Sequence, residues 1–240
     1  MPKTPRATIP SYRDANADAS PLFFWIKAVE EGRMNDINVS GAAVSVGGRP
    51  LVVGIGGTIG AVSSTERALC IALEAAAQQG FATRMFGGAD MARLPLYDPR
   101  ATTRTPDERA FVDAVRGASA VIIASPGYHG SISGVVKNAL DLLEETAKDE
   151  RPYLADMPVG LIATAYGWQA TGSTIAALRS IVHALRGWPT PFAAAINTQV
   201  TRFDDEGGAS DPAVVEQLRL IGRQVARFAP LARVATESGQ

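Results

Sequence analysis

The sequence lacks several features that mark particular classes of protein. Cys70 is the only cysteine among 240 residues, which rules out an intramolecular disulfide and a cysteine-based metal cluster within one chain. We therefore expect a reducing, cytoplasmic location. The formal net charge of −1 gives no basic face for nucleic acid. No apolar run reaches the length of a membrane span, and the N-terminus has no secretion-signal pattern, so neither nucleic acid nor a membrane is expected as a partner.

Familiar catalytic signatures are absent as well. The chain has no H-E-x-x-H, no G-x-S-x-G, no Walker Gly-Lys pair and no acidic cluster with metal spacing. We therefore predict no metal site and assign no catalytic acid or base. His183 and Cys70 both stand among apolar residues in helical patterns, and for both we favour packing roles.

The stretch from residue 120 to residue 141 organises the rest of the chain. Residues 120–124 form a continuous apolar run without alternation, as in a parallel strand covered on both faces by helices. Pro126 and two glycines then indicate a shaped loop over residues 125–130. From Ser131, the predicted N-cap, the apolar period becomes helical. This order places Tyr128 and His129 at the carboxyl end of a parallel strand, where open α/β sheets bind their ligands.

A second buried strand is predicted over residues 50–57, followed by a loop rich in glycine and hydroxyl residues and then by a helix. Thr58, Ser63, Ser64 and Thr65 lie where the loop enters the helix. Hydroxyl groups, unpaired N–H groups and the helix dipole favour a phosphate at such a place. The loop matches neither the dinucleotide fingerprint G-x-G-x-x-G nor a Walker loop. The alternative is a helix cap that binds no ligand.

Three further strands are predicted over residues 81–86, 157–164 and 191–196. Five β-α units without an internal repeat indicate an α/β fold with a flavodoxin-like, doubly wound five-stranded parallel sheet and helices on both faces. Residues 1–49 are expected to form an N-terminal arm with a short amphipathic helix near residues 20–32. Residues 50–232 then form the domain, and residues 233–240 a C-terminal tail.

Aromatic residues follow the fourth predicted strand. Adjacent parallel strands are about 4.8 Å apart, so Tyr128 and the segment Tyr166-Gly167-Trp168 are expected to border one planar ligand. Packing in the core or against another subunit is an equal alternative for Trp168. Leu96 and Tyr97, in the long loop of residues 91–105, are predicted either to wall the same site or to pack under the loop.

Residues 125–141 read S-P-G-Y-H-G-S-I-S-G-V-V-K-N-A-L-D and closely resemble a segment of the NADPH-dependent FMN reductase family, usually S-P-x-Y-x-G-S-x-x-G-x-L-K-N-A-L-D. Val136 in place of leucine is the one departure. The resemblance extends over roughly residues 51–197. It implies FMN on a flavodoxin-like fold, with NADPH or NADH as reductant. The loop residues that it assigns to the flavin are Pro126, Gly127, Tyr128, His129 and Gly130.

The same resemblance covers the predicted phosphate loop. The family usually shows G-S-x-R-x-x-S-x-T/N there, and Thr58, Ser63 and Thr65 take the hydroxyl places. Gly60 stands where the family often has arginine, so a charge-assisted contact is missing unless Arg67 folds back against the loop. If that charge is absent, FMN is expected to bind loosely and to behave as a substrate.

The implied function is an NAD(P)H-dependent FMN reductase that transfers hydride to flavin N5, with a flavin-dependent monooxygenase as a partner that would receive the reduced flavin. One alternative is an FMN-containing NAD(P)H quinone or azo reductase. Another is a flavodoxin-like electron carrier, against which the near-neutral charge speaks. The resemblance also implies a homodimer or homotetramer.

Overall fold

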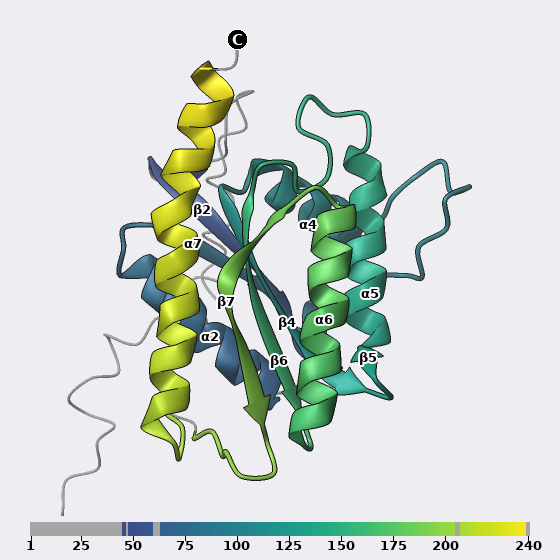
Figure 1. Ribbon diagram of the computed structural model, residues 1–240. Helices are drawn as coiled ribbons and strands as arrows, with labels where there is room; N and C mark the ends of the chain where they lie inside the picture. Colours follow the sequence, from purple (N-terminus) through teal and green to yellow (C-terminus); the bar gives the residue numbers. More distant parts are fainter. Residues whose placement is uncertain (1–44, 47, 60–62, 205–206, 239–240) are drawn as a thin grey trace, which may run out of the picture. The chain divides into compact units, whose positions relative to one another are not determined.

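The structure is a computed structural model that describes residues 45–46, 48–59, 63–204 and 207–238. These residues form a central sheet with helices on both sides (Figure 1). The amphipathic helix expected near residues 20–32 lies outside the described residues.

Seven strands are found among the described residues. They are β1 (Ser45–Val46), β2 (Arg49–Gly56), β3 (Ala82–Phe86), β4 (Ala120–Tyr128), β5 (Ser131–Ile132), β6 (Pro158–Ala165) and β7 (Trp188–Asn197). Five of them pair in parallel in the order β3-β2-β4-β6-β7. Numbered along the chain, this is the 2-1-3-4-5 order of flavodoxin-like sheets, so the predicted five-stranded parallel sheet is confirmed. β1 and β5 add short antiparallel pairs to β2 and β4.

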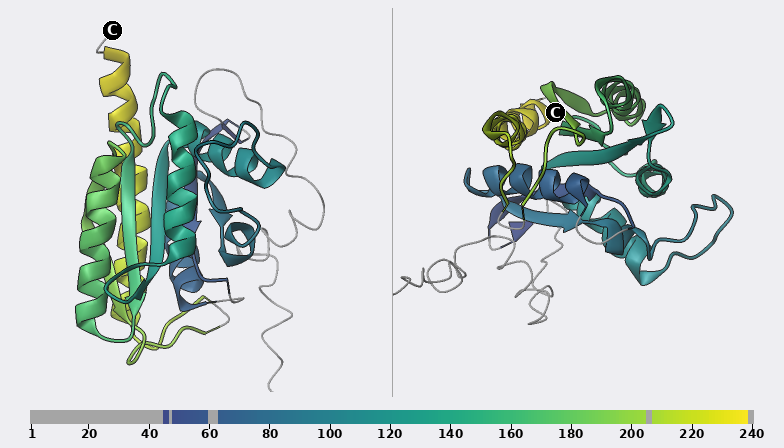
Figure 2. Two further views of the ribbon diagram at one scale, coloured as in Figure 1. Left: turned by 90° about the vertical axis from the view of Figure 1, so that its right-hand side faces the viewer. Right: turned by 90° about the horizontal axis from the view of Figure 1, so that it is seen from below.

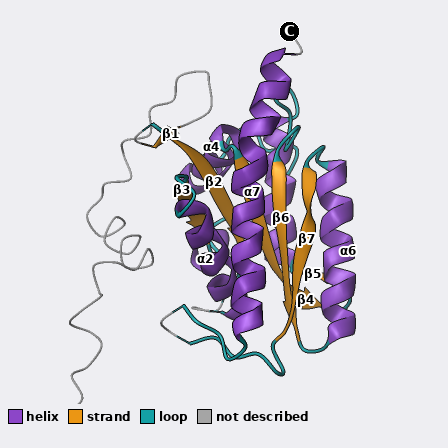
Figure 3. Ribbon diagram, turned by 60° about the vertical axis from the view of Figure 1, so that its left-hand side comes forward, coloured by secondary structure: helices purple, strands orange, loops and turns teal. Residues whose placement is uncertain are grey.

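The helices divide between the two faces of the sheet, as predicted. They are α2 (Ser64–Ala77), α3 (Gly88–Met91), α4 (Pro106–Gly117), α5 (Gly134–Asp141), the 3-10 helix η3 (Leu142–Thr146), α6 (Trp168–Ala184) and α7 (Pro212–Ser238). One apolar cluster joins α2 and α7 to the sheet. The other joins α4, α5, η3 and α6 to the opposite face. Figure 2 shows this layering, and Figure 3 shows α2 and α7 together in front of the strands.

The helices differ from the sequence-based expectations at two places, the end of α7 and His183. α7 continues to Ser238, through residues that the pattern separates as a tail from residue 233. The packing role favoured for His183 is wrong, because this residue is exposed. The buried positions of α6 are Thr171, Thr174, Leu178 and Val182, and His183 falls one residue beyond that stripe.

α2 and α7 pack with their backbones in close approach. A Cβ atom added at Gly222 of α7 would lie 2.1 Å from the carbonyl oxygen of Ala72 and 2.9 Å from the Cβ of Ala75. Only glycine leaves room for this crossing, since real side chains do not approach so closely. Gly222 therefore sets how α7 lies on α2.

β7 lies at one end of the parallel strand order, and its backbone groups find partners within the chain. Pro189 and Pro191 have no N–H group. The guanidinium of Arg179, on α6, donates to the carbonyl oxygens of Thr190 and Pro191 at 3.5 and 3.1 Å. The N–H of Phe192 donates to the side chain of Gln224 at 3.3 Å. Residues 189–192 are thus tied to the two neighbouring helices.

The topology singles out one place on the sheet for a ligand. The chain leaves β2 toward one edge strand, β3, and later returns to the other side of β2 with β4. Ligands of open α/β sheets bind at such a switch point, beyond the carboxyl ends of the strands. The loops after β2 and β4 both end there. None of the described helices is both long and apolar enough to span a membrane.

Candidate functional site

The motif at the end of β4 is a hairpin rather than an open loop. β4 continues through Tyr128, and Tyr128 pairs with Ser131 of β5. Only His129 and Gly130 form the turn, with φ of 51° and 88°, the positive values that two-residue hairpin turns require. The prediction that Pro126 and the glycines form a loop from residue 125 is wrong at its start, because Pro126 still pairs in parallel with Thr164 of β6 and its missing N–H is tolerated there.

Hydroxyl groups fix this hairpin to the helix that follows it. The Ser125 hydroxyl, fully buried, accepts from the N–H of Ser133 at 2.9 Å and donates to the Pro126 carbonyl at 2.9 Å. Ser133, not Ser131, is the N-cap of α5, and its hydroxyl accepts from the N–H of Val136 at 3.4 Å. Ser131 does not cap the helix because it lies in β5.

The two glycines of the motif have different surroundings. A Cβ at Gly127 would lie 2.6 Å from Thr174 Oγ1, so Gly127 allows the hairpin to pack on α6. Nothing lies within 4 Å of a Cβ placed at Gly130. The turn is therefore open on that side, whereas Gly127 faces the protein.

Aromatic side chains stand exposed at this end of the sheet. The exposed fractions are 52% for Tyr128, 74% for Tyr166 and 64% for Trp168. Tyr128 is the last residue of β4 and Tyr166 directly follows β6, so each lies two residues beyond the paired residues Pro126 and Thr164 of these neighbouring strands. Packing of Trp168 in the core of its own domain is wrong, since the residue opens α6 at the surface. His129 is exposed as well.

Asn197 joins the loop after β6 to the loop after β7, and sequence reasoning missed it. Its Oδ1 accepts from the N–H of Gly167 at 3.1 Å and from the N–H of Gln199 at 3.0 Å, while the residue is only 4% exposed. Gly167 takes a φ of 105°, which favours glycine. The available signal was an asparagine directly after an apolar strand, a residue type that bonds its own turn.

The predicted phosphate loop leads into α2, and Ser63 is the N-cap. Its hydroxyl accepts from the N–H of Glu66 at 3.2 Å, and the Glu66 carboxylate accepts in return from the N–H of Ser63 at 3.4 Å. This is a capping box. The helix leaves the N–H groups of Ser64 and Thr65 without an intrahelical acceptor. Thr58 and Ser64 are partly exposed.

Thr65 and Arg67 point away from the roles that the sequence suggested. Thr65 is 2% exposed, and its hydroxyl lies 2.6 Å from the hydroxyl of Thr164 on β6. Its side chain therefore anchors α2 to the sheet, and only its backbone N–H faces the helix N-terminus. The Arg67 guanidinium donates to the carbonyl oxygen of Phe203, beyond β7, at 2.7 Å. Gly60 lies outside the described residues.

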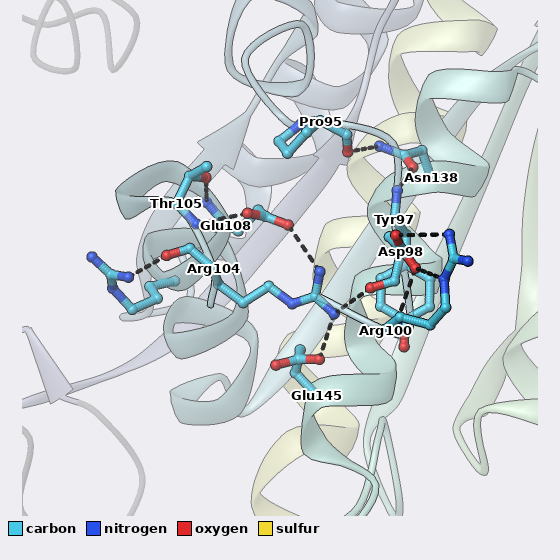
Figure 4. Close-up of polar contacts among 10 residues, drawn as sticks. Pro95, Tyr97, Asp98, Arg100, Arg104, Thr105, Glu108, Asn138 and Glu145 are labelled. Carbon is cyan, nitrogen blue, oxygen red and sulfur yellow. Dashed lines mark hydrogen bonds and ion pairs between the residues drawn. The ribbon is translucent and has the colours of Figure 1, made fainter. Parts of the chain in front are cut away.

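Asn138, from the K-N-A-L-D part of the motif, holds the loop that follows α3. Its Oδ1 accepts from the N–H of Tyr97 at 2.8 Å, and its Nδ2 donates to the Pro95 carbonyl at 2.9 Å. Figure 4 shows these contacts beside a second group centred on Arg104. Leu96, between the two anchored residues, is 86% exposed, so it is presented to solvent on a fixed loop. The alternative that Leu96 packs under the loop is wrong.

Arg104 secures the far end of the same loop (Figure 4). Its guanidinium bonds the Asp98 carbonyl at 3.1 Å and the carboxylates of Glu145 and Glu108 at 2.9 and 3.4 Å. It also lies 4.9 Å from the centre of the Tyr97 ring. The hydrogen bond to Glu145 raises the pKa of Arg104. Tyr97 thus packs against Arg104, and the loop is held at both ends.

These residues fit the two ends of an FMN molecule unequally. Exposed aromatic rings and an open glycine turn suit a planar ring. Hydroxyl groups and the N–H groups of Ser64 and Thr65 can donate to a phosphate, but the only charged group in the α2 capping box is the carboxylate of Glu66. Within the described ranges, no three His, Cys, Asp or Glu side chains come together to hold a metal ion.

The model of the family described as NADPH-dependent FMN reductase matches residues 50–201. The chain belongs to this family. The match includes the β4–β5 hairpin, the α2 N-terminus and Asn197, so the NADPH-dependent FMN reductase segment contains every site residue that the sequence analysis proposed.

Two curated relatives of the chain are FMN-dependent NADPH-azoreductases. The FMN-dependent NADPH-azoreductase of Staphylococcus haemolyticus (strain JCSC1435) is 33% identical over 124 residues, which cover 49% of this chain and 59% of that enzyme. The chain thus matches less than two thirds of that relative's length. The same values hold for the FMN-dependent NADPH-azoreductase of Staphylococcus aureus.

Two solved structures share the fold. FerB, a flavoenzyme NAD(P)H:(acceptor) oxidoreductase from Paracoccus denitrificans, aligns with a TM-score of 0.62 at 16% identity and covers 76% of this chain and 98% of its own. An apo NADH:FMN oxidoreductase named EMOB aligns with a TM-score of 0.56 at 21% identity, covering 74% and 88%. At these identities the likeness is one of fold.

Proposed function

We propose that this protein is an NAD(P)H-dependent FMN reductase that oxidises NADPH or NADH and passes the hydride to FMN. The observation that carries the proposal is the place of the family motif. Its hairpin ends at the switch point of a 2-1-3-4-5 sheet, next to the hydroxyl-rich N-terminus of α2. Bound FMN would supply the hydride-accepting chemistry at its N5 atom.

The residues divide the work of binding. Tyr128, Tyr166 and Trp168 border the ring, and the turn of His129 and Gly130 approaches it with backbone atoms. Pro126 and Gly127 form the strand beneath this turn, and Asn197 holds Gly167 in place. Thr58, Ser63 and Ser64 offer hydroxyl groups to the phosphate end, together with the backbone N–H of Thr65. No side chain has to move a proton, because the hydride passes directly between two cofactors.

A second function is an azo or quinone reductase in which FMN stays bound. It is favoured by the 33% identity to FMN-dependent NADPH-azoreductases. An electron carrier without a nicotinamide site is less well supported, because the net charge is only −1 and carriers use strong charge for docking.

Steady-state NADH and NADPH oxidation by the purified protein tests these functions, with free FMN, FAD, riboflavin, a quinone or an azo dye as acceptor. The visible spectrum of the protein as isolated is recorded alongside. Rapid turnover with FMN and little bound yellow cofactor supports the flavin reductase. A tightly bound flavin that turns over only with azo or quinone acceptors supports the second function, and the absence of any turnover contradicts both.

The wider setting of the protein also belongs to the proposal. We infer a cytoplasmic homodimer or homotetramer whose reductase domain continues to the end of α7. Reduced FMN released from it would reach a flavin-dependent monooxygenase. Size-exclusion chromatography with light scattering measures the assembly, and co-purification from the native cell tests the partner.

A further inference from the structure

We propose that the side-chain amide nitrogen of Asn197 donates a hydrogen bond to a carbonyl oxygen of the ligand that binds beside Tyr166 and Trp168. The inference rests on the proposed function, since it adds a binding residue to the same site. Two ligands of that site carry such an acceptor. The flavin ring has carbonyl oxygens on its pyrimidine edge, and the nicotinamide has one in its carboxamide.

The two partners of the Asn197 side chain fix its orientation. Its Oδ1 accepts from the N–H of Gly167 at 3.1 Å and from the N–H of Gln199 at 3.0 Å. An asparagine side chain accepts through its oxygen and donates through its NH2 group. Because both partners are donors, the atom that they share must be the oxygen. The NH2 group therefore points away from these two N–H groups.

This NH2 group has no acceptor among the residues that the structure describes. The residue is nevertheless only 4% exposed, and a buried donor without a partner costs free energy. Asn197 Nδ2 is not one of the fully buried side-chain atoms that lack a partner within the described ranges, so solvent reaches it. A ligand that brings an acceptor can reach it by the same way.

Asn138 shows what an asparagine does when it serves only to hold a loop. Its Oδ1 accepts from the N–H of Tyr97, and its Nδ2 donates to the Pro95 carbonyl, so both ends of the side chain are used within the chain. Asn197 uses only its oxygen in this way. A carboxylate would hold the same two N–H groups more strongly. An asparagine at this position leaves one donor for another partner.

The free donor of Asn197 lies at the end of the sheet where the aromatic residues stand. Asn197 ends β7 and pairs with Ala165, the last residue of β6. The NH2 group belongs to the same amide as the oxygen that holds Gly167. It therefore lies beyond the carboxyl ends of β6 and β7, where open α/β sheets bind ligands. Tyr166 and Trp168, on either side of Gly167, are 74% and 64% exposed there.

Flavin fluorescence titration of the full-length protein at pH 8 tests the donor with two substitutions. Asn197→Asp keeps an acceptor for Gly167 and Gln199 but replaces the donor by an oxygen, which repels a carbonyl oxygen. Asn197→Ala removes the acceptor as well. If the ligand is the flavin, both variants should weaken its binding about tenfold. The melting temperature should fall clearly in Asn197→Ala and much less in Asn197→Asp.

Gln224→Glu is the matched control. The Gln224 side chain also accepts from a backbone N–H of β7, that of Phe192, at 3.3 Å. The substitution makes the same change from amide to carboxylate, but Phe192 lies five residues, or about 16 Å, before Asn197 along the strand. It should leave flavin binding unchanged.

Steady-state kinetics distinguish the two sources of the carbonyl oxygen. If the acceptor is the nicotinamide carboxamide, flavin binding stays unchanged in Asn197→Asp, and the KM for NADH or NADPH rises about tenfold with little change in kcat. Unchanged flavin binding together with an unchanged KM in Asn197→Asp overturns the inference, because Asn197 would then only hold its loops. That result leaves the reductase intact, whereas a wild type that binds no flavin contradicts the proposed function and this inference together.

Discussion

Tyr128 is the residue on which the ring end of the proposed site depends most. It is 52% exposed at the tip of β4, where its ring has no core to fill. Tyr128→Ala should weaken flavin binding by about 1–2 kcal/mol, or about 5- to 30-fold, in a fluorescence titration. Trp188→Ala is the control: Trp188 is 68% exposed but begins β7, at the amino ends of the parallel strands, whereas Tyr128 ends β4. Unchanged flavin affinity in Tyr128→Ala would remove the tyrosine from the site.

Cys70 illustrates how packing controls a single group. Burial, followed by the nearby carboxylates of Glu66 and Glu74, raises the pKa of its thiol from 9.0 to about 12. Because only the thiolate reacts, alkylation of the native protein at pH 8 should be about a thousandfold slower than in urea. The raised pKa also means that stability is lost as pH rises above about 9, where only the unfolded chain ionises. The labelling is followed by mass spectrometry, and rapid alkylation of Cys70 in the native protein would contradict the raised pKa of its thiol.

At the scale of single residues, the sequence indicated which chemical groups would lie near the site but not where each side chain would point. The hydroxyl residues before α2 were visible, but the burial of the Thr65 side chain against Thr164 depends on a contact 99 positions away. Ser133 replaced Ser131 as the cap because a two-residue turn and a short strand intervene. The hydrogen bond from the N–H of Gly167 to Asn197 Oδ1 likewise joins two loops that no local sequence pattern connects.

At the scale of the helices and strands, the crossing of α2 and α7 leaves no room for a larger side chain at Gly222. Gly222→Ala should destabilise the protein by about 1–3 kcal/mol, since the added Cβ would lie 2.1 Å from the Ala72 carbonyl oxygen. Urea unfolding measures the loss. Gly172→Ala on α6, where nothing lies within 4 Å of the new Cβ, should instead stabilise by about 0.5–1 kcal/mol. Equal effects of the two substitutions would contradict this account.

The elements themselves were largely predictable. Parallel strands buried on both faces are continuous apolar runs, so β2, β4 and β6 were visible in the sequence. The extension of β4 through Pro126 was hidden, because proline and glycine usually end a strand. The short strand β5 escaped for a different reason, since two residues are too few to show a period.

For the whole molecule, flavin binding should appear as added stability. A ligand at about one hundred times its dissociation constant stabilises a protein by about 2.7 kcal/mol, which for a chain of this size corresponds to about 5–11 °C in melting temperature. FMN should produce this shift in a calorimetric scan, whereas inorganic phosphate at the same concentration should not. A flavin that binds without raising the melting temperature would mean that it also binds the unfolded chain.

Topology was predictable at this scale, because five β-α units without repeats leave few arrangements that keep crossovers right-handed. The charge balance of the site was only half visible. Gly60 in the place of an arginine could be read directly from the sequence. The hydrogen bond from the N–H of Gly88 to the Glu66 carboxylate could not, because Gly87 and Gly88 follow another strand, β3.

The way β7 is tied to its neighbours has a consequence for the protein in a crowded cell. An edge strand with free N–H and C=O groups invites strands from other molecules, which is the first step toward aggregation. Over residues 189–192, two prolines offer no donor, Arg179 covers two carbonyl groups and Gln224 takes an N–H. A foreign strand finds almost no backbone partner there, so Arg179 serves the solubility of the fold.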